Sequence, residues 1–189
     1  MNTKSEIANW NVKNVNYAVH EAGHVTAACQ RELPVYAELK IRMTDLGSTG
    51  ATTWHWGGTP EDDLFILYAG IETSKLFGLG EAGLLKDIRD IGLIEAPDSV
   101  KQDQQIKAER FVRENKPMIL KMAYVLFQLG ELPDDGTLIY LIFNGLIEIA
   151  IPRDFLATVE SMPKYKWTLV KWPMSSEPVV NDRALGEEQ

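Results

Sequence analysis

The pattern His-Glu-x-x-His, which spans His20 to His24, constrains this chain more than any other feature of its sequence. Residues four apart on a helix lie nearly above one another, so a helix over 17–25 presents both imidazoles to one point. Two such imidazoles are typical zinc ligands, and Glu21 beside them is placed to deprotonate a zinc-bound water. Gly23 costs this helix about 1 kcal/mol against alanine, so we expect a neighbouring segment, backbone or substrate to approach it closely.

Helical periodicity dominates the rest of the chain. The helix that carries the motif is expected to begin at a cap, Asn11 or Asn14, and to run to about Arg31, before Pro34. Further helices are predicted at 63–76, 100–115, 117–129 and 137–149, and strands at 35–43 and 51–56. The predicted fold class is therefore mainly α with a small β-sheet (α+β).

Turn and cap residues divide the chain between these elements. Thr59 or Glu61 is the expected start of the 63–76 helix and Gly78 its end, and 130–136 is expected to be a connector. The length of 189 residues and the hydrophobic content of 45% suit one domain. The predicted organisation is an N-terminal segment at 1–16, a single zinc-peptidase-like domain at 17–165 and a C-terminal tail at 166–189.

Composition narrows the classes of function. A net charge of −8 and no cluster of Lys or Arg argue against nucleic-acid binding, because phosphate contacts need clustered positive charge. No apolar run reaches the roughly 18–20 residues of a membrane span, and the N-terminus lacks the apolar core of a signal peptide. The only cysteine, Cys29, cannot form an internal disulfide, which fits a reducing compartment. We therefore expect a soluble, cytoplasmic protein.

A catalytic zinc site needs a third protein ligand. The zincin variant with a third histidine six residues after the second is excluded, because Gln30 stands at that position. The remaining histidine, His55, lies between two tryptophans and is interpreted as an ordinary strand residue. A carboxylate is left, and periodicity alone does not rank Glu72, Asp87 and Asp90.

The motif is the first of several short segments along the chain that are compared together. They are Ala18-Val19-His20-Glu21-Ala22-Gly23-His24, Pro34-Val35, Leu39-Lys40-Ile41, Leu46-Gly47, Leu67-Tyr68-Ala69-Gly70, Leu76-Phe77-Gly78 and Gly83-Leu84-Leu85-Lys86-Asp87-Ile88. Together they resemble the protease domain of the FtsH-type membrane-anchored AAA+ zinc proteases. The resemblance covers about 17–142, with weaker similarity at 114–116 and 132–136, and implies a zincin-like helical domain of that type.

The resemblance implies that Asp87 is the third zinc ligand, because the matching aspartate has that role in the family. The region after Asp87 is shorter and less rich in Ala and Thr than in the family, which keeps Asp90 as the alternative ligand or as an orienting residue behind a ligand. The family couples this domain to an ATPase. This chain has neither a Walker motif nor a transmembrane segment, so a free-standing version is expected.

The leading hypothesis is a zinc-dependent endopeptidase that hydrolyses unfolded or flexible polypeptides without its own ATPase. Glu21 is its expected general base, and the second strand offers an edge to an extended peptide. The alternative is a non-proteolytic assembly or regulatory domain of the same fold that retains zinc. The partners considered are a polypeptide substrate, a separate unfoldase and further copies of the chain.

Overall fold

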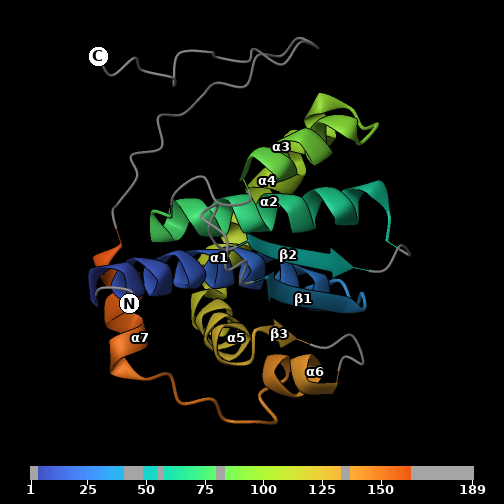
Figure 1. The fold of residues 1–189 in the computed structure, drawn as a ribbon. Helices are drawn as coiled ribbons and strands as arrows, with labels where there is room; N and C mark the ends of the chain where they lie inside the picture. The colour runs from blue at the N-terminus through green and yellow to red at the C-terminus, as the bar shows by residue number, and fades with distance from the viewer. Residues whose placement is uncertain (1–3, 41–48, 55–57, 80–83, 133–136, 163–189) are drawn as a thin grey trace, which may run out of the picture.

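One long helix, α1 (Lys4–Gln30), lies in the middle of the molecule, between α2 (Pro60–Phe77) and α5 (Lys116–Leu129) (Figure 1). In the computed structural model, residues 4–40, 49–54, 58–79, 84–132 and 137–162 are described. The remaining elements are β1 (Val35–Lys40), β2 (Thr49–Trp54), α3 (Leu84–Leu93), α4 (Asp98–Glu114), β3 (Glu131–Leu132), α6 (Thr137–Phe143) and α7 (Arg153–Ser161). The protein is thus mainly helical, as predicted. No helix in these described ranges is long and apolar enough to cross a membrane.

The hydrophobic core forms where α1 meets its neighbours. Small side chains on α1, including Ala18, Ala22 and Ala28, are fully buried and let α2 and α5 approach closely. Gly23 faces α2, and a Cβ at this position would collide with Thr73 and press against the Ala69 carbonyl oxygen. The expected close approach at Gly23 is therefore confirmed, and it is the backbone and side chain of α2 that come near.

The ends of α2 follow from local sequence. Thr59 is its N-cap and forms a capping box with Asp62, and Pro60 occupies the first turn, where its missing N–H costs nothing. Gly78 ends the helix with φ of 68°, a left-handed conformation that favours glycine. The predicted end near Gly78 is confirmed. The cap is Thr59 rather than Glu61, and the helix begins at Pro60, earlier than the predicted start at 63. This is the helix that covers the histidine pair.

The two predicted strands pair in a small antiparallel sheet of order β2-β1-β3. Ala37 of β1 pairs with Thr52 of β2 on one side and with Leu132 of β3 on the other. The short strand β3 lies in the stretch 130–136 that was expected to be a connector, so that expectation was incomplete. Within the described residues β2 is an edge strand, because β1 is its one paired neighbour in the sheet.

Two expectations about helix bounds were wrong, and one described helix was not expected. Helix α1 begins at Lys4, so Asn11 and Asn14 lie inside it instead of capping it. An internal asparagine costs less than about 0.7 kcal/mol, too little to stop a helix that packing extends. Helix α6 ends at Phe143 instead of 149, because Gly145 adopts φ of 68° and the N–H of Leu146 closes a Schellman motif. Helix α7 was not predicted at all.

Candidate metal centre

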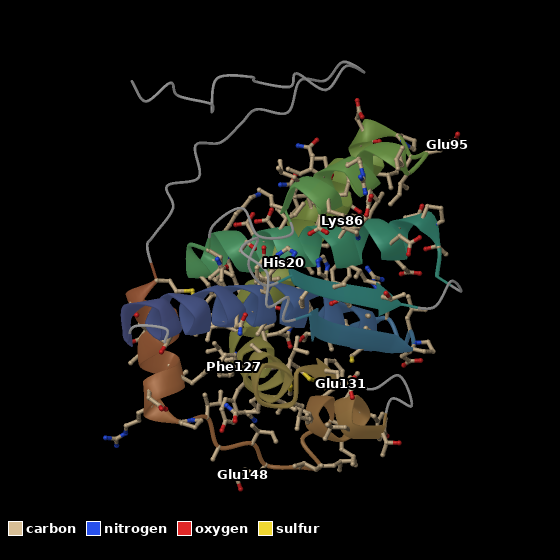
Figure 2. All side chains as sticks on the ribbon, viewed as in Figure 1. His20, Lys86, Glu95, Phe127, Glu131 and Glu148 are labelled. Carbon is tan, nitrogen blue, oxygen red and sulfur yellow. The ribbon has the colours of Figure 1, made fainter. Side chains whose placement is uncertain are left out.

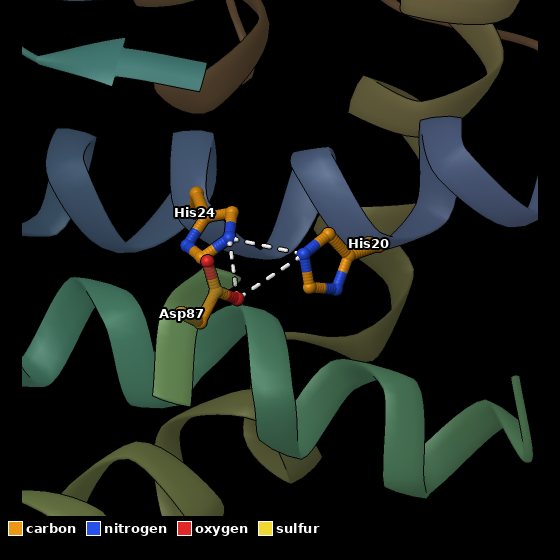
Figure 3. A group of neighbouring side chains, drawn as sticks. All are labelled: His20, His24 and Asp87. Atoms are coloured by element: carbon orange, nitrogen blue, oxygen red, sulfur yellow. Dashed lines mark hydrogen bonds and ion pairs between the residues drawn. The ribbon is translucent and has the colours of Figure 1, made fainter. Parts of the chain in front are cut away.

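Three side chains from two helices converge beside α2. His20 and His24 lie one turn apart on α1, and Asp87 projects from the first turn of α3 (Figure 3). The Nε2 atoms of the two histidines are 3.2 Å apart, and each is 3.2 Å from Oδ2 of Asp87. The three atoms therefore form an equilateral triangle. Such a group could hold a metal ion.

The triangle is buried. His20 is 1% exposed, His24 3% and Asp87 4%. Figure 2 shows His20 in the middle of the molecule, whereas Glu95 and Glu148 lie at its edge. Gly70 of α2 lies close against the His24 ring, because a Cβ at that position would overlap three ring atoms. The ring is thus held in place by packing as well as by its polar contacts.

The outward nitrogens of the two imidazoles have partners of their own. Nδ1 of His24 lies 2.8 Å from the carbonyl oxygen of Ile66, and Nδ1 of His20 lies 2.9 Å from Oγ of Ser74. A carbonyl oxygen only accepts hydrogen bonds, so Nδ1 of His24 carries the hydrogen. In the neutral ring, Nε2 of His24 therefore directs a lone pair at the triangle.

The surroundings of the triangle favour a positive charge. Burial alone lowers the pKa of His24, but the charge and hydrogen bond of Asp87 outweigh burial and raise that pKa to about 9. Burial raises the pKa of Asp87, whereas the two histidines lower it well below its usual range. Oδ2 of Asp87 is buried and receives no hydrogen bond from a hydroxyl or a backbone N–H among the described residues. A cation bound among them would satisfy all three atoms at once.

The spacing of the triangle fits a first-row divalent metal. Zinc binds imidazole nitrogen and carboxylate oxygen at about 2.0–2.1 Å with tetrahedral angles, which puts neighbouring ligand atoms about 3.3 Å apart. The observed separations are 3.2 Å. Three ligand side chains meet here in the described part of the chain. A structural zinc site normally has four, whereas a catalytic site has three and keeps one position for water or substrate.

Glu21 is buried beside the histidines and is held by the sheet. It is 3% exposed, and the hydroxyl of Thr52 on β2 donates to its Oε2 at 2.5 Å. Its negative charge adds to the effect of Asp87 in raising the pKa of His24. Glu21 is therefore a further buried carboxylate next to the candidate ligands in the sequence and is not a member of the triangle.

The other candidate ligands lie elsewhere. Asp90 pairs with Lys86 and Arg89 on the outer side of α3 and is not part of the triangle. Glu72 is buried, but its Oε1 accepts hydrogen bonds from the side chains of Lys75 and Gln105. His55 lies outside the described residues. Of the three open carboxylates, the structure brings only Asp87 to the histidines.

Sequence reasoning missed the residues that support the site. Thr52, Ser74 and the carbonyl of Ile66 contact the candidate base or ligands across 31 to 54 positions of sequence. No local pattern marks such contacts, since a serine or threonine in a helix or strand is ordinary. Gly70 did carry a signal, because a mid-helix glycine implies a close approach, as it did at Gly23.

Comparison with protein-family models finds no family that matches the chain, and comparison with curated proteins finds no match either. The geometry of the site and the motifs of the sequence are therefore the features that indicate a function. Both centre on the same residues, His20, Glu21 and His24.

Proposed function

We propose that this chain is a zinc-dependent endopeptidase that cleaves unfolded or flexible polypeptides. The observation that carries the proposal is the triangle of His20, His24 and Asp87 with a separate buried carboxylate, Glu21, beside it. Two imidazoles and one carboxylate are a zinc ligand set of hydrolytic enzymes. The resemblance to the FtsH-type protease domain implies the same ligands and a zincin-like fold.

His20, His24 and Asp87 would hold the metal. Zinc bound there supplies a Lewis acid, which polarises the scissile carbonyl and lowers the pKa of water toward about 7. Glu21 accepts the proton of the attacking water and later delivers it to the leaving amine. The Thr52 hydroxyl donates a hydrogen bond to Oε2 of Glu21 and so fixes the orientation of the carboxylate. The other carboxylate oxygen, Oε1, accepts and releases the proton.

The substrate surface is the edge strand β2. An edge strand presents unpaired backbone N–H and C=O groups, which pair with an extended peptide. Ala51 and Thr53 on this strand are exposed, while Thr52 between them turns toward Glu21. A peptide paired with β2 therefore lies on the strand that contacts the base. Folded proteins rarely offer an extended segment, so unfolded chains are the expected substrates.

The first test is metal content and hydrolysis in one preparation. We expect about one zinc per chain, and slow, chelator-sensitive, ATP-independent cleavage of a denatured, alkylated protein. Glu21→Gln removes the base but none of the ligands, so zinc content and the unfolding midpoint should stay while cleavage falls by at least about 10²-fold. The same substrate in its folded state, with and without ATP, is the control for the need for an extended segment.

Each outcome decides a separate part of the proposal. Turnover that survives in zinc-loaded Glu21→Gln contradicts the role of Glu21. Iron in place of zinc contradicts the metal assignment. A zinc-loaded wild-type protein that cleaves neither form of the substrate contradicts the endopeptidase and favours the non-proteolytic alternative.

A further inference from the structure

The two candidate histidine ligands are held by partners of different chemistry. Nδ1 of His24 donates to the carbonyl of Ile66, which cannot donate in return. Nδ1 of His20 faces the hydroxyl of Ser74 at 2.9 Å, which can donate or accept. The backbone thus fixes the tautomer of His24, whereas the tautomer of His20 depends on one side chain.

A metal at the triangle needs the lone pair of Nε2 from both rings. In a neutral imidazole this requires the hydrogen on Nδ1. We propose that Ser74 is a positioning residue of the metal centre: its hydroxyl oxygen accepts the Nδ1 hydrogen of His20, fixes that tautomer and ring orientation, and thereby sets the affinity for the metal. This inference rests on the metal centre of the proposed function and is independent of proteolysis.

The position of Ser74 is itself fixed by the end of α2. Its carbonyl oxygen accepts the N–H of Leu79 at 2.8 Å, and the N–H of Gly78 donates to the carbonyl of Lys75 at 3.2 Å. These two bonds form a Schellman motif. Leu79 is 1% exposed and belongs to the core, which locks the last turn of the helix. The hydroxyl is therefore held on a rigid backbone, as an orienting partner of a ligand must be.

Nothing else in the described structure can take over this role. Ser74 is fully buried, and its hydroxyl is the hydrogen-bond partner found for Nδ1 of His20 among the described residues. Loss of the hydroxyl therefore leaves a buried N–H without an acceptor whenever His20 binds a metal through Nε2.

The test measures zinc affinity by competition with a chromophoric chelator. Ser74→Ala should weaken zinc binding about 10- to 100-fold, the range seen when the partner of a ligating histidine is removed. Ser74→Thr keeps the hydroxyl and should restore most of the affinity. Thr73→Val is the matched control, because Thr73 is equally buried on the same turn and its Oγ1 has no hydrogen-bond partner in the described part of the chain.

A second readout does not depend on any variant folding. In the zinc-loaded wild-type protein, long-range ¹H–¹⁵N spectra should show His20 with a hydrogen-bonded proton on Nδ1 and the metal on Nε2. Metal on Nδ1 of His20 would overturn the proposal, as would wild-type affinity in Ser74→Ala or no recovery in Ser74→Thr. A wild-type protein that binds zinc but cleaves nothing refutes the endopeptidase alone and leaves this inference standing.

Discussion

Replacing Gly70 by alanine tests whether the candidate metal centre depends on the packing of α2. A Cβ at Gly70 would lie less than 3.0 Å from Cε1, Nε2 and Nδ1 of His24, where ordinary contacts are 3.4–4 Å. The ring must therefore retreat by about 1 Å to restore normal van der Waals separation. Zinc–ligand distances tolerate only about ±0.2 Å. Gly70→Ala should thus remove His24 from the ligand set.

The expected magnitudes follow from the two effects involved. Overpacking a core costs typically about 1–3 kcal/mol, and alanine returns up to about 1 kcal/mol of helix propensity. If alanine returns the full amount, the metal-free variant should be destabilised by about 0–2 kcal/mol. Its zinc affinity should fall at least as far as the roughly 10- to 100-fold loss that follows removal of a supporting partner.

Gly92 provides the matched control for this change. It lies in α3, and a Cβ there meets nothing within 4 Å. Gly92→Ala should keep zinc affinity and raise the midpoint of thermal unfolding by about 2–4 °C, because alanine favours the helix by up to about 1 kcal/mol. The measurements are thermal unfolding without metal and zinc titration of each variant. Wild-type zinc affinity in Gly70→Ala would refute the reasoning.

Three further predictions concern the ligand carboxylate, the orientation of the base and pH. Asp87→Asn should lose zinc, whereas Asp90→Asn should keep it. The ion pairs of Asp90 are solvent-accessible and contribute at most about 1 kcal/mol to the stability of the fold. Equal zinc content in the two variants would contradict the assignment of Asp87 as a ligand. Thr52→Val should keep zinc but lower kcat more than it raises KM, because Glu21 loses the hydrogen-bond donor that orients it. Thr53→Val, on the exposed face of the same strand, is the control. An unchanged kcat in Thr52→Val would show that Thr52 has no part in the mechanism. The pKa of His24 is raised from 6.5 to about 9, so the stabilisation from its protonated form is full below pH 6.5 and is lost as pH rises through 9. The pKa of Asp87 is lowered from 3.8, so its stabilisation is present above pH 3.8 and is lost on further acidification. Urea unfolding of the metal-free protein should therefore show maximal stability between about pH 4 and 6.5. Zinc affinity should rise from pH 6 to pH 8, because zinc displaces the proton of His24. A metal-free protein that is more stable at pH 9 than at pH 6 would contradict the predicted direction of the pH dependence.

The sequence was sufficient to predict features that depend on interactions between residues close together in the chain. Helical spacing placed His20 and His24 on one face, and the Thr59 cap with the Gly78 terminus bounded α2. Both features depend on residues within one or two turns of one another. The antiparallel pairing of β1 with β2 likewise follows from alternation of apolar and polar residues on either side of a turn-like segment.

The sequence was not sufficient to predict features that depend on how the helices pack against one another. The three carboxylates Glu72, Asp87 and Asp90 have similar sequence surroundings, and only the docking of α3 on α2 distinguishes them. Within the described chain, that docking uses Leu84 and Ile91 against the apolar side of α2. The same holds for Ser74, whose partner lies 54 positions away. The extra turns at the start of α1 were missed because asparagine favours a cap and tolerates a helix almost equally.

The ligands come from helices far apart in the sequence: 63 positions (87 − 24) separate His24 on α1 from Asp87 on α3. An unfolded chain has no such site, so the free energy of binding zinc there would add directly to the stability of the fold. Free zinc at about 1,000 times its dissociation constant adds about 4 kcal/mol, a large share of the stability of an ordinary domain. If the site holds zinc as proposed, a cell short of zinc would lose this protein to quality-control proteases. The abundance of the protein would follow the zinc supply.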